Sequence, residues 1–455
     1  MNFELPELSP PQQGALDLML DKGRALVSLR MGMGKTLVTI LANKAQGSRK
    51  WLIICPKNAQ LTWRKEIEKW ASELSLNVYS IRGAKPLRTQ TWINLRTESD
   101  WIASCTYAGF MADYLNIAKL HPDVIICDES HRIRNRKSKG FKLLRTLKSK
   151  HMYLLTGTPV TRGPQDFWTS LHLVNRKEFS GFWKYAERYH DVQQGYWGVE
   201  IGEPQNMAEH REIIKPYVYS ISREEANKYL PPLTRQFLPI EMSKEQRQIY
   251  KALTDEQIAL IGNDKLLVTP NKLSQYVRFR QLLICPQIFD SSMGHGPAIE
   301  MVAERILDCP LEDRHCVIFT PFTAAIEHFQ RYLYRQGLQS IEYLQGGLEE
   351  QDIELAIDEF RANRGIMICS THYSESFELD PATICYSIGP VWDPNVHDQA
   401  EGRLRRMTGH HPIMSYYAHF ENTLEDHMMD VLSGKVVNIK LSMPVHEFLR
   451  GAADD

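Results

Sequence analysis

The stretch SLRMGMGKTLVTI, residues 28–40, decides the fold of the first part of the chain. A strand-like run ends near Arg30, a glycine-rich turn follows, and a helical pattern begins at once. Such a turn directs backbone N–H groups and a helix N-terminus at an anion. We therefore predict a nucleotide-phosphate site whose turn contains Gly32 and Gly34. Lys35 would reach the outer phosphates, and Thr36 would reach a magnesium ion.

One residue departs from the general pattern G-x-x-x-x-G-K-[ST], because Leu29 stands where that pattern has its first glycine. An ordinary glycine-rich turn is therefore an alternative. The stretch DVIICDESH, residues 123–131, favours the phosphate site: an apolar strand places Asp128 and Glu129 at its carboxyl end, where open α/β sheets bind ligands. We predict that Asp128 holds the magnesium ion and that Glu129 orients or deprotonates the attacking water. Two acids at a solvated strand end are the alternative.

Short apolar runs alternate with longer helical patterns along most of the chain. Examples are RALVSLR, WLIICP and DVIICD in the first half, and HCVIFT, GIMICST and ATICYSIG in the second. This alternation predicts an α/β protein with parallel sheets covered by helices on both faces. Because the rhythm stops around residues 190–235, we predict two tandem lobes, residues 1–215 and 236–455, with a linker at 216–235.

The composition is that of a folded protein of 455 residues, with 43% hydrophobic and 24% charged residues and a formal net charge of -1. A nucleic-acid partner would therefore be held by local basic patches. No apolar run reaches the roughly 18 residues that a membrane helix needs. The acidic N-terminal stretch does not resemble a secretory signal, so we expect a cytoplasmic protein with no membrane partner. The eight cysteines are scattered singly, as expected of core residues and not of a zinc site.

The stretch HDQAEGRLRRMTG, residues 397–409, carries the clearest signal of the second half. On a helix, Gln399, Arg403 and Arg406 would fall at i, i+4 and i+7, on one face. Because a guanidinium donates two parallel hydrogen bonds to a phosphate, we predict that Arg403 and Arg406 contact the γ-phosphate. A solvated basic helix face is the alternative.

These motifs together resemble the superfamily 2 helicases, and specifically the SWI/SNF-type double-stranded DNA translocases, over roughly residues 8–430. The stretches that carry the resemblance are LSPPQQGALDLM, MGMGKT, DESH, LLTGTPVTRGPQDFWTSLHLVN and the C-terminal arginine motif. The resemblance implies two RecA-like lobes with ATP and Mg²⁺ in the cleft between them. It also implies that Gln12 reads the adenine edge and that Gln399 belongs to the ATP site. Coupling of hydrolysis to movement would involve His131, Thr156, Gly157 and Thr158.

We expect the polymer along which the protein moves to be DNA. Residues 131–151 contain nine Lys or Arg and no acid, so this run can neutralise phosphates, although a solvated helix face is the alternative. From this run and from positions that resemble the family's backbone-contact motifs, the expected DNA contacts are Lys57, Thr106, Arg132, Arg134, Arg136, Thr320, Thr371 and Trp392. Such contacts predict binding that depends on salt and has weak sequence preference.

The stretch STHYSESFEL, residues 370–379, departs from the family. Tyr373, Ser374 and Ser376 stand where SWI/SNF-type enzymes have glycines, which permit close backbone approach. This departure leaves the coupling of the second lobe to ATP and DNA open.

The implied activity is ATP hydrolysis coupled to translocation or unwinding on double-stranded or branched DNA. The short chain suggests a bacterial or phage enzyme that remodels forks or junctions in recombination, repair or replication. A second hypothesis is an ATP-gated DNA-binding clamp, or a motor subunit for a protein partner, without strand separation. An RNA helicase is the third.

Overall fold

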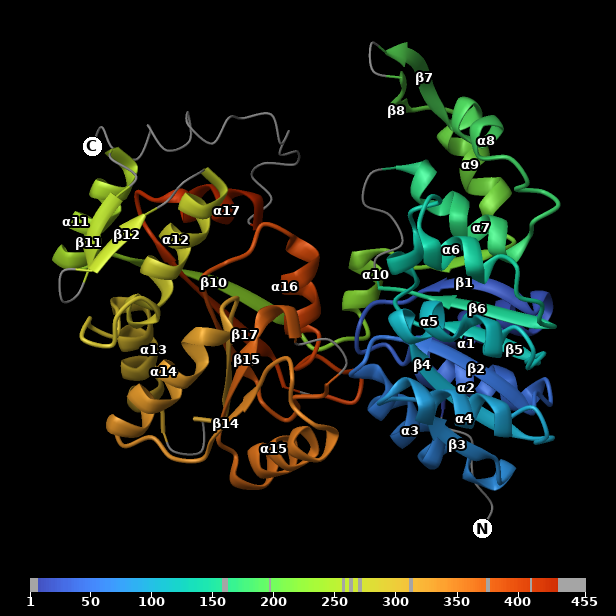
Figure 1. The fold of residues 1–455 in the computed structure, drawn as a ribbon, viewed down its shortest axis with the longest axis horizontal. Coiled ribbons are helices and arrows are strands. Elements are labelled where there is room, and N and C mark those ends of the chain that lie inside the picture. The colour runs from blue at the N-terminus through green and yellow to red at the C-terminus, as the bar shows by residue number, and fades with distance from the viewer. Residues whose placement is uncertain are drawn as a thin grey trace. The chain divides into compact units, whose positions relative to one another are not determined.

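The chain forms two compact units, Met1–Leu230 and Pro231–Asp455, which we call the first and second lobes (Figure 1). The computed structural model describes residues 7–157, 163–195, 198–255, 258–261, 265–268, 272–310, 314–373, 377–409 and 411–432. Each lobe is built on its own parallel sheet. The predicted α/β class, with two parallel-sheet lobes in tandem, is confirmed.

The first lobe contains a seven-stranded sheet in the order β3-β4-β2-β5-β6-β1-β9. Its strands are β1 (Arg24–Ser28), β2 (Lys50–Cys55), β3 (Asn77–Ser80), β4 (Trp101–Thr106), β5 (Val124–Cys127), β6 (His151–Leu155) and β9 (Val218–Ser220). All neighbouring strands are parallel. Every strand therefore ends at one edge of the sheet, the carboxyl edge, and begins at the opposite amino edge.

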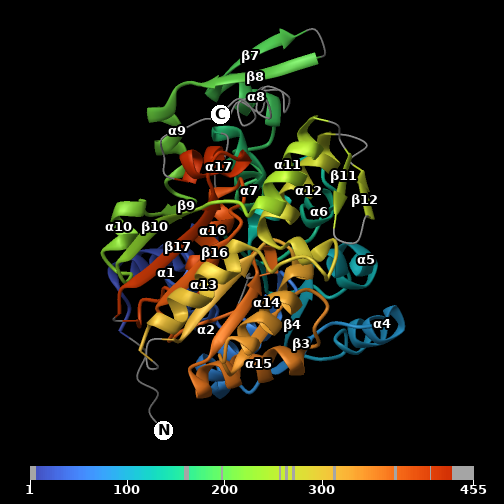
Figure 2. The ribbon, with the colours of Figure 1, turned by 90° about the vertical axis from the view of Figure 1, so that its left-hand side faces the viewer.

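Helices cover this sheet because its inner strands are buried on both faces, as a parallel sheet requires. They are α1 (Pro10–Lys22), α2 (Lys35–Ala45), α3 (Ala59–Trp70), α4 (Lys85–Asn94), α5 (Tyr107–Ile117), α6 (Lys139–Leu144), α7 (Trp168–Val174), α8 (Phe182–Tyr189), α9 (Met207–Ile214) and α10 (Arg223–Asn227). Short 3₁₀ turns are η1 (Ser72–Leu74), η2 (Ser130–Ile133) and η3 (Pro164–Phe167). An antiparallel hairpin of β7 (His190–Gly195) and β8 (Gly198–Pro204) extends beyond α8 (Figure 2).

The second lobe contains a six-stranded sheet in the order β10-β17-β16-β13-β15-β14, again parallel throughout. Its strands are β10 (Leu233–Ile240), β13 (Cys316–Thr320), β14 (Ile341–Leu344), β15 (Ile366–Ser370), β16 (Ile384–Ile388) and β17 (Ile413–Phe420), and β11 (Ile258–Ile261) pairs with β12 (Lys265–Val268) in a separate hairpin. Its helices are α11 (Lys244–Asp255), α12 (Lys272–Ile284), α13 (Pro297–Asp308), α14 (Thr323–Arg335), α15 (Glu350–Asn363), α16 (Pro394–Glu401) and α17 (Leu424–Leu432), with 3₁₀ turns η4 (Pro286–Ile288) and η6 (Thr371–Tyr373).

Residues 216–235, predicted as a linker, contain regular structure that belongs to both lobes. Strand β9 pairs with β1 in the first sheet, and β10 pairs with β17 along its whole length in the second. Helix α10 lies between these strands in the sequence. The aromatic and polar composition of this stretch therefore reflects edge strands, which need fewer apolar residues than central ones.

The cysteines are free thiols, and all are buried except Cys309, which is partly exposed. This agrees with their prediction as core residues. Among the described residues, no cluster of three metal-ligating side chains occurs. Nor does any helix in the described ranges combine the length and the apolar character needed to cross a bilayer.

Candidate functional site

The phosphate loop connects β1 to α2 in the first lobe. Its two glycines, Gly32 and Gly34, have φ angles of 76° and 74°, in the left-handed region that other residues rarely adopt. A Cβ atom on Gly34 would also lie 2.6 Å from Nε2 of Gln12. The turn therefore requires glycine here. It delivers the first N–H groups of α2 to the carboxyl edge, as an anion site needs.

Leu29 and Gln12 fix the two sides of this loop. Leu29, where the general pattern has glycine, is fully buried, and its carbonyl oxygen accepts a hydrogen bond of 2.9 Å from Nζ of Lys35. On the other side, Nε2 of Gln12 donates to the carbonyl oxygen of Met33 at 3.3 Å. Oε1 of Gln12 accepts from the backbone N–H of Ser9 at 3.0 Å. A contact between Gln12 and adenine, which stays a prediction, would require the amide to exchange these bonds.

Asp128 and Glu129 follow β5 directly, at the carboxyl edge. Oδ2 of Asp128 accepts a hydrogen bond of 3.0 Å from the indole N–H of Trp63, and Oδ1 accepts one of 3.0 Å from the backbone N–H of Glu129. Burial, together with the charge of Glu129, raises the pKa of Asp128 to about 6, and the Lys35 ammonium opposes this shift. Asp128 is therefore a half-buried carboxylate that is charged at neutral pH, and a cation would stabilise this charge. This environment fits a magnesium ion held by Asp128 and Thr36.

Glu129 has a strained backbone. Its φ and ψ angles are 50° and 51°, in the left-handed region, which costs a residue with a side chain about 1–2 kcal/mol. The side chain is almost buried, and its Oε2 lies 3.2 Å from Nδ1 of His131. Strain of this kind persists where the surrounding structure enforces it, and it is frequent at active sites.

His131 also connects the acids to the end of β6. Its Nδ1 lies 3.4 Å from Oγ1 of Thr156. The next residue, Gly157, faces the phosphate loop, because a Cβ atom there would lie 3.9 Å from Nζ of Lys35. Strands β5, β6 and β1 are neighbours in the sheet. The structure thus brings together the acids, the Thr-Gly pair and the phosphate loop at three adjacent strand ends. Thr158 lies outside the described residues.

Sequence reasoning missed two residues that hold Asp128. Trp63 of α3 donates to its carboxylate, and the hydroxyl of Tyr107 donates to its carbonyl oxygen at 2.7 Å. Tyr107 begins α5, directly after β4. Trp63 follows β2, which pairs with β5, whereas Tyr107 follows β4, on the far side of β2. Only knowledge of the strand order would have indicated these two residues.

In the second lobe, the prediction that Gln399, Arg403 and Arg406 share one helix face is wrong. Helix α16 ends at Glu401, so only Gln399 of the three is helical. The chain then turns back toward the preceding segment, and the carbonyl oxygen of Arg403 accepts a hydrogen bond of 3.1 Å from the N–H of Leu379. This tertiary hydrogen bond replaces one that a longer helix would have made.

The two arginines nevertheless lie close to each other in sequence and differ in environment. Arg403 is only 4% exposed. Arg406 lines a cavity of about 200 Å³, and its Nη2 lies 3.2 Å from Oε1 of Glu378. Arg361 lies beside the same segment, with Nη2 3.2 Å from Oδ1 of Asp380. Arg406 is thus held within its own lobe by an acidic residue.

Comparisons with known protein families match both the segment that contains the phosphate loop and the segment that contains the two arginines. A family model described as SNF2-related domain matches residues 21–286, which include the phosphate loop and both acids. A second, described as helicase conserved C-terminal domain, matches residues 299–408, which include Arg403 and Arg406. The chain belongs to the SNF2-related family. The resemblance to SWI/SNF-type superfamily 2 enzymes is thereby confirmed.

Individual relatives of this SNF2-related chain are distant. It is 24% identical over 442 residues to chromodomain-helicase-DNA-binding protein 1 of Homo sapiens, covering 90% of this chain and 25% of the relative. It is 23% identical to SWI/SNF-related matrix-associated actin-dependent regulator of chromatin subfamily A member 1 of Mus musculus, covering 88% and 40%. The chain thus spans less than half the length of these relatives. A solved SWI2/SNF2 ATPase core of Sulfolobus solfataricus in complex with dsDNA aligns with a TM-score of 0.45 at 21% identity, covering 95% of this chain and 93% of that chain.

The residues predicted to contact DNA outside the basic run lie near the carboxyl edges of their sheets. Lys57 is exposed two residues after β2, and Thr106 is the last residue of β4 and the cap of α5. In the second lobe Thr320 ends β13 and Thr371 follows β15, and both are buried. Trp392 is half-buried between β16 and α16. Their contact with DNA stays a prediction.

The basic run 131–151 is divided by the fold. It leads from the carboxyl end of β5 to the amino end of β6, which are parallel neighbours, so its two ends lie at opposite edges of the sheet. Near the carboxyl edge, Arg132 is exposed, Arg134 lies 3.6 Å from a carboxylate oxygen of Asp166, and Arg136 stacks over aromatic rings of α8. The last cations of the run therefore lie at the opposite edge of the sheet from these arginines.

The stretch that departs from the family is described only in part. Tyr373 ends the 3₁₀ turn η6, whereas Ser374 and Ser376 lie outside the described residues.

Proposed function

We propose that this chain is an ATP-driven motor that translocates along double-stranded or branched DNA. The observation that supports it most is the junction of β5, β6 and β1, where a phosphate loop, the acid pair Asp128 and Glu129, and a Thr-Gly segment meet. A loop alone would indicate nucleotide binding. The added acids indicate hydrolysis. The Thr156-Gly157 segment, which contacts Glu129 through His131, could couple hydrolysis to a conformational change in the rest of the lobe.

The residues of the first lobe would act as follows. Lys35 exchanges the carbonyl oxygen of Leu29 for the outer phosphate oxygens of ATP. Glu129, held by His131, orients the attacking water and accepts its proton. Asp128 and Thr36 hold Mg²⁺, which supplies charge neutralisation at the transferring phosphate when bound.

The second lobe completes the proposal. Arg403 and Arg406 would approach the γ-phosphate when the lobes close on ATP, and their forks would stabilise the charge of the transition state. Arg406 would have to leave Glu378 to do so. Gln12 and Gln399 would contact ATP from either lobe. Alternating closure and opening would move the lobes along a DNA strand.

The cellular role that we propose is the remodelling of forks or junctions in recombination, repair or replication, in a bacterial or phage-infected cytoplasm. A chromatin substrate is a second candidate, since the relatives' names refer to chromatin. Protein partners are compatible with both.

ATP hydrolysis by the full chain should be measured without nucleic acid and with single-stranded, duplex, forked and four-way DNA, with RNA and with nucleosomes, alongside displacement of a triplex strand. We expect stimulation by duplex or branched DNA together with triplex displacement, and neither in Lys35→Ala. ATP binding without DNA stimulation would instead support the clamp, and stimulation by RNA alone would support an RNA helicase. Stronger stimulation by nucleosomes than by free duplex would favour the chromatin role.

A further inference from the structure

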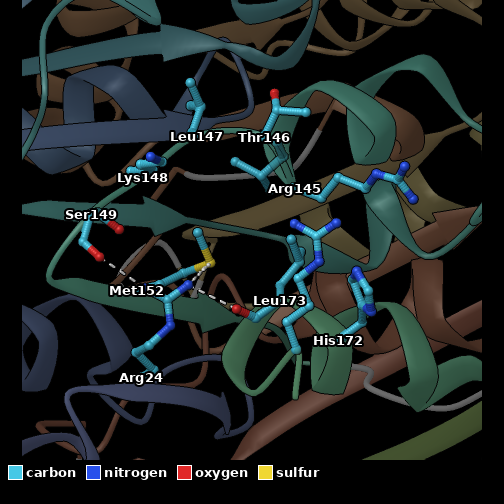
Figure 3. Close-up of a pocket in the computed structure, with 11 residues that line it drawn as sticks. Arg24, Arg145, Thr146, Leu147, Lys148, Ser149, Met152, His172 and Leu173 are labelled. Atoms are coloured by element: carbon cyan, nitrogen blue, oxygen red, sulfur yellow. Dashed lines mark hydrogen bonds between the residues drawn. The ribbon is translucent and has the colours of Figure 1, made fainter. Parts of the chain in front are cut away.

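A cavity of the first lobe lies at the amino edge, at the opposite end of β1 from the phosphate loop (Figure 3). Its volume is about 480 Å³, and its walls come from the starts of β1 and β6, from residues 144–149 and from the end of α7. We call it the amino-edge pocket. The charged residues that line it are Arg24, Arg145, Lys148 and Arg176, and none of its described lining residues is acidic.

Arg24 is half-buried at the start of β1, in the wall of the pocket. Its guanidinium donates to three backbone carbonyl oxygens, at 2.8–3.3 Å, and to the thioether of Met152 at 3.4 Å. These bonds use four of its five N–H groups. Among the described residues no carboxylate pairs with it, and burial lowers the pKa of Arg24. An enclosed cation with only neutral partners is stabilised by an anion.

His172 contributes a buried ring to the wall of the pocket. It is 4% exposed, and its ring lines the pocket. Nδ1 bonds to the carbonyl oxygen of Phe179 at 2.9 Å, whereas Nε2 has no hydrogen-bond partner within the described part of the chain. Burial lowers the pKa of His172, and the charges of Arg176 and Arg145 lower it further. The ring thus lies in the positive field of Arg176 and Arg145, and the hydrogen bond to the carbonyl oxygen of Phe179 acts against their effect on its pKa.

The cations continue beyond the mouth of the pocket. Arg145, Lys148 and Arg176 are exposed, and so are three lysines within three residues of them in the sequence, Lys142, Lys150 and Lys177. A free ion inside the pocket would meet only its walls. A polyanion could place one phosphate in the pocket and others on the exposed cations around it.

We propose that the amino-edge pocket binds a backbone phosphate of nucleic acid, as a second contact separate from the carboxyl edge. The inference rests on the proposed DNA partner. It gives the C-terminal cations of the basic run a role that is different from that of Arg132, Arg134 and Arg136, since the two groups lie at opposite edges of the sheet.

The test is equilibrium binding of a labelled duplex to the full chain without nucleotide, over a range of salt concentrations. Two variants probe different properties: Arg145→Glu/Arg176→Glu reverses the charge of the rim, and Thr146→Trp fills the pocket at an exposed lining position without changing charge. Lys184→Glu/Lys215→Glu is the control for the charge change, because both lysines are exposed on the same lobe away from the pocket.

We expect the charge-reversal variant to lose about tenfold or more in affinity and to reduce the salt slope by about 2, since each neutralised B-DNA phosphate contributes about 0.9. Thr146→Trp should also weaken binding, and the control pair should bind as the unmodified chain does. Unchanged binding by Thr146→Trp, or an equal loss in the control pair, would overturn the proposal.

Two competitors identify the source of the anion. Inorganic phosphate could bind to the unmodified chain but not to Thr146→Trp, while both bind the duplex equally well. This result would assign the pocket to a free ion and overturn the nucleic-acid assignment. Polyglutamate that competes more strongly than unlabelled duplex would assign it to an acidic protein segment, with the same result. ATP hydrolysis is measured separately. If DNA fails to stimulate it while pocket-dependent duplex binding persists, the proposed motor fails and the pocket does not.

Discussion

Replacing Trp63 by phenylalanine should change the chemistry of Asp128 while keeping an aromatic ring in the core. Trp63 is 1% exposed, and its indole N–H donates to Oδ2 of Asp128 at 3.0 Å. Phenylalanine has no donor. Because this hydrogen bond favours the charged carboxylate, its loss raises the pKa of Asp128.

The size of the shift follows from the strength of the bond. A hydrogen bond to a charged group contributes about 1.5–3 kcal/mol, and one pKa unit corresponds to about 1.4 kcal/mol. The pKa of Asp128, raised to about 6 in the native protein, should therefore rise by a further unit or two, to about 7–8. Magnesium needs the ionised carboxylate, so hydrolysis is lost as the pH falls through this pKa. The acid side of the pH profile should move toward neutral pH.

The assay is kcat/KM for ATP hydrolysis across the acid and neutral range, at saturating DNA, because this ratio reports the pKa values of the enzyme before ATP binds. Trp92→Phe is the matched control, because Trp92 is fully buried in the same lobe and its indole N–H donates to Asp113, a carboxylate away from the phosphate loop, at 3.1 Å. Both variants should lose about 1–3 kcal/mol of unfolding free energy. Only Trp63→Phe should shift the profile. Coincident acid limbs in the two variants would refute the role of Trp63 in tuning Asp128.

Three further substitutions test other parts of the site. Glu129→Gln should slow ATP hydrolysis by about 10²–10⁴-fold with ATP binding retained in equilibrium dialysis, and near-normal turnover would contradict its role. Gly34→Ala, whose Cβ would lie 2.6 Å from Nε2 of Gln12, should abolish binding of an ATP analogue and lower the unfolding free energy by about 1–2 kcal/mol, so unchanged binding and melting would exclude the loop geometry. Arg406→Lys should lower kcat by about 10³-fold or more. Its stability, measured by denaturant unfolding, should change by less than about 1 kcal/mol, because its pairing with Glu378 is partly exposed, and an unaltered kcat would remove Arg406 from the reaction.

The parts of the site that were predictable from sequence are those formed by consecutive residues. The phosphate loop needs only a strand, two glycines and a helix start between Arg24 and Lys35, and local geometry dictates the rest. Asp128 and Glu129 were placed correctly at a strand end because an apolar run of residues indicates a buried strand on its own. The parallel α/β class followed from the same alternation in both lobes.

Contacts between distant segments were not predictable. The bond from Trp63 to Asp128 depends on α3 and β5 being brought together by the strand order, which the sequence does not state. The end of α16 at Glu401 depends on a hydrogen bond between Arg403 and Leu379, in another segment. The helix predicted for Gln399, Arg403 and Arg406 was therefore too long, because tertiary hydrogen bonding overrides helical propensity beyond Glu401.

The burial of Leu29 has a consequence for the protein between catalytic cycles. Complete exposure of its side chain would cost about 1.5–3 kcal/mol, so the first part of the loop is tied to the interior of the lobe. Met33 is fully buried as well, so only Arg30, Met31 and the two glycines are left to adjust to an incoming ligand. Without ATP, the phosphate loop should therefore keep the conformation that binds phosphate. The conformational entropy that the loop loses on binding ATP should be small for an enzyme of this kind.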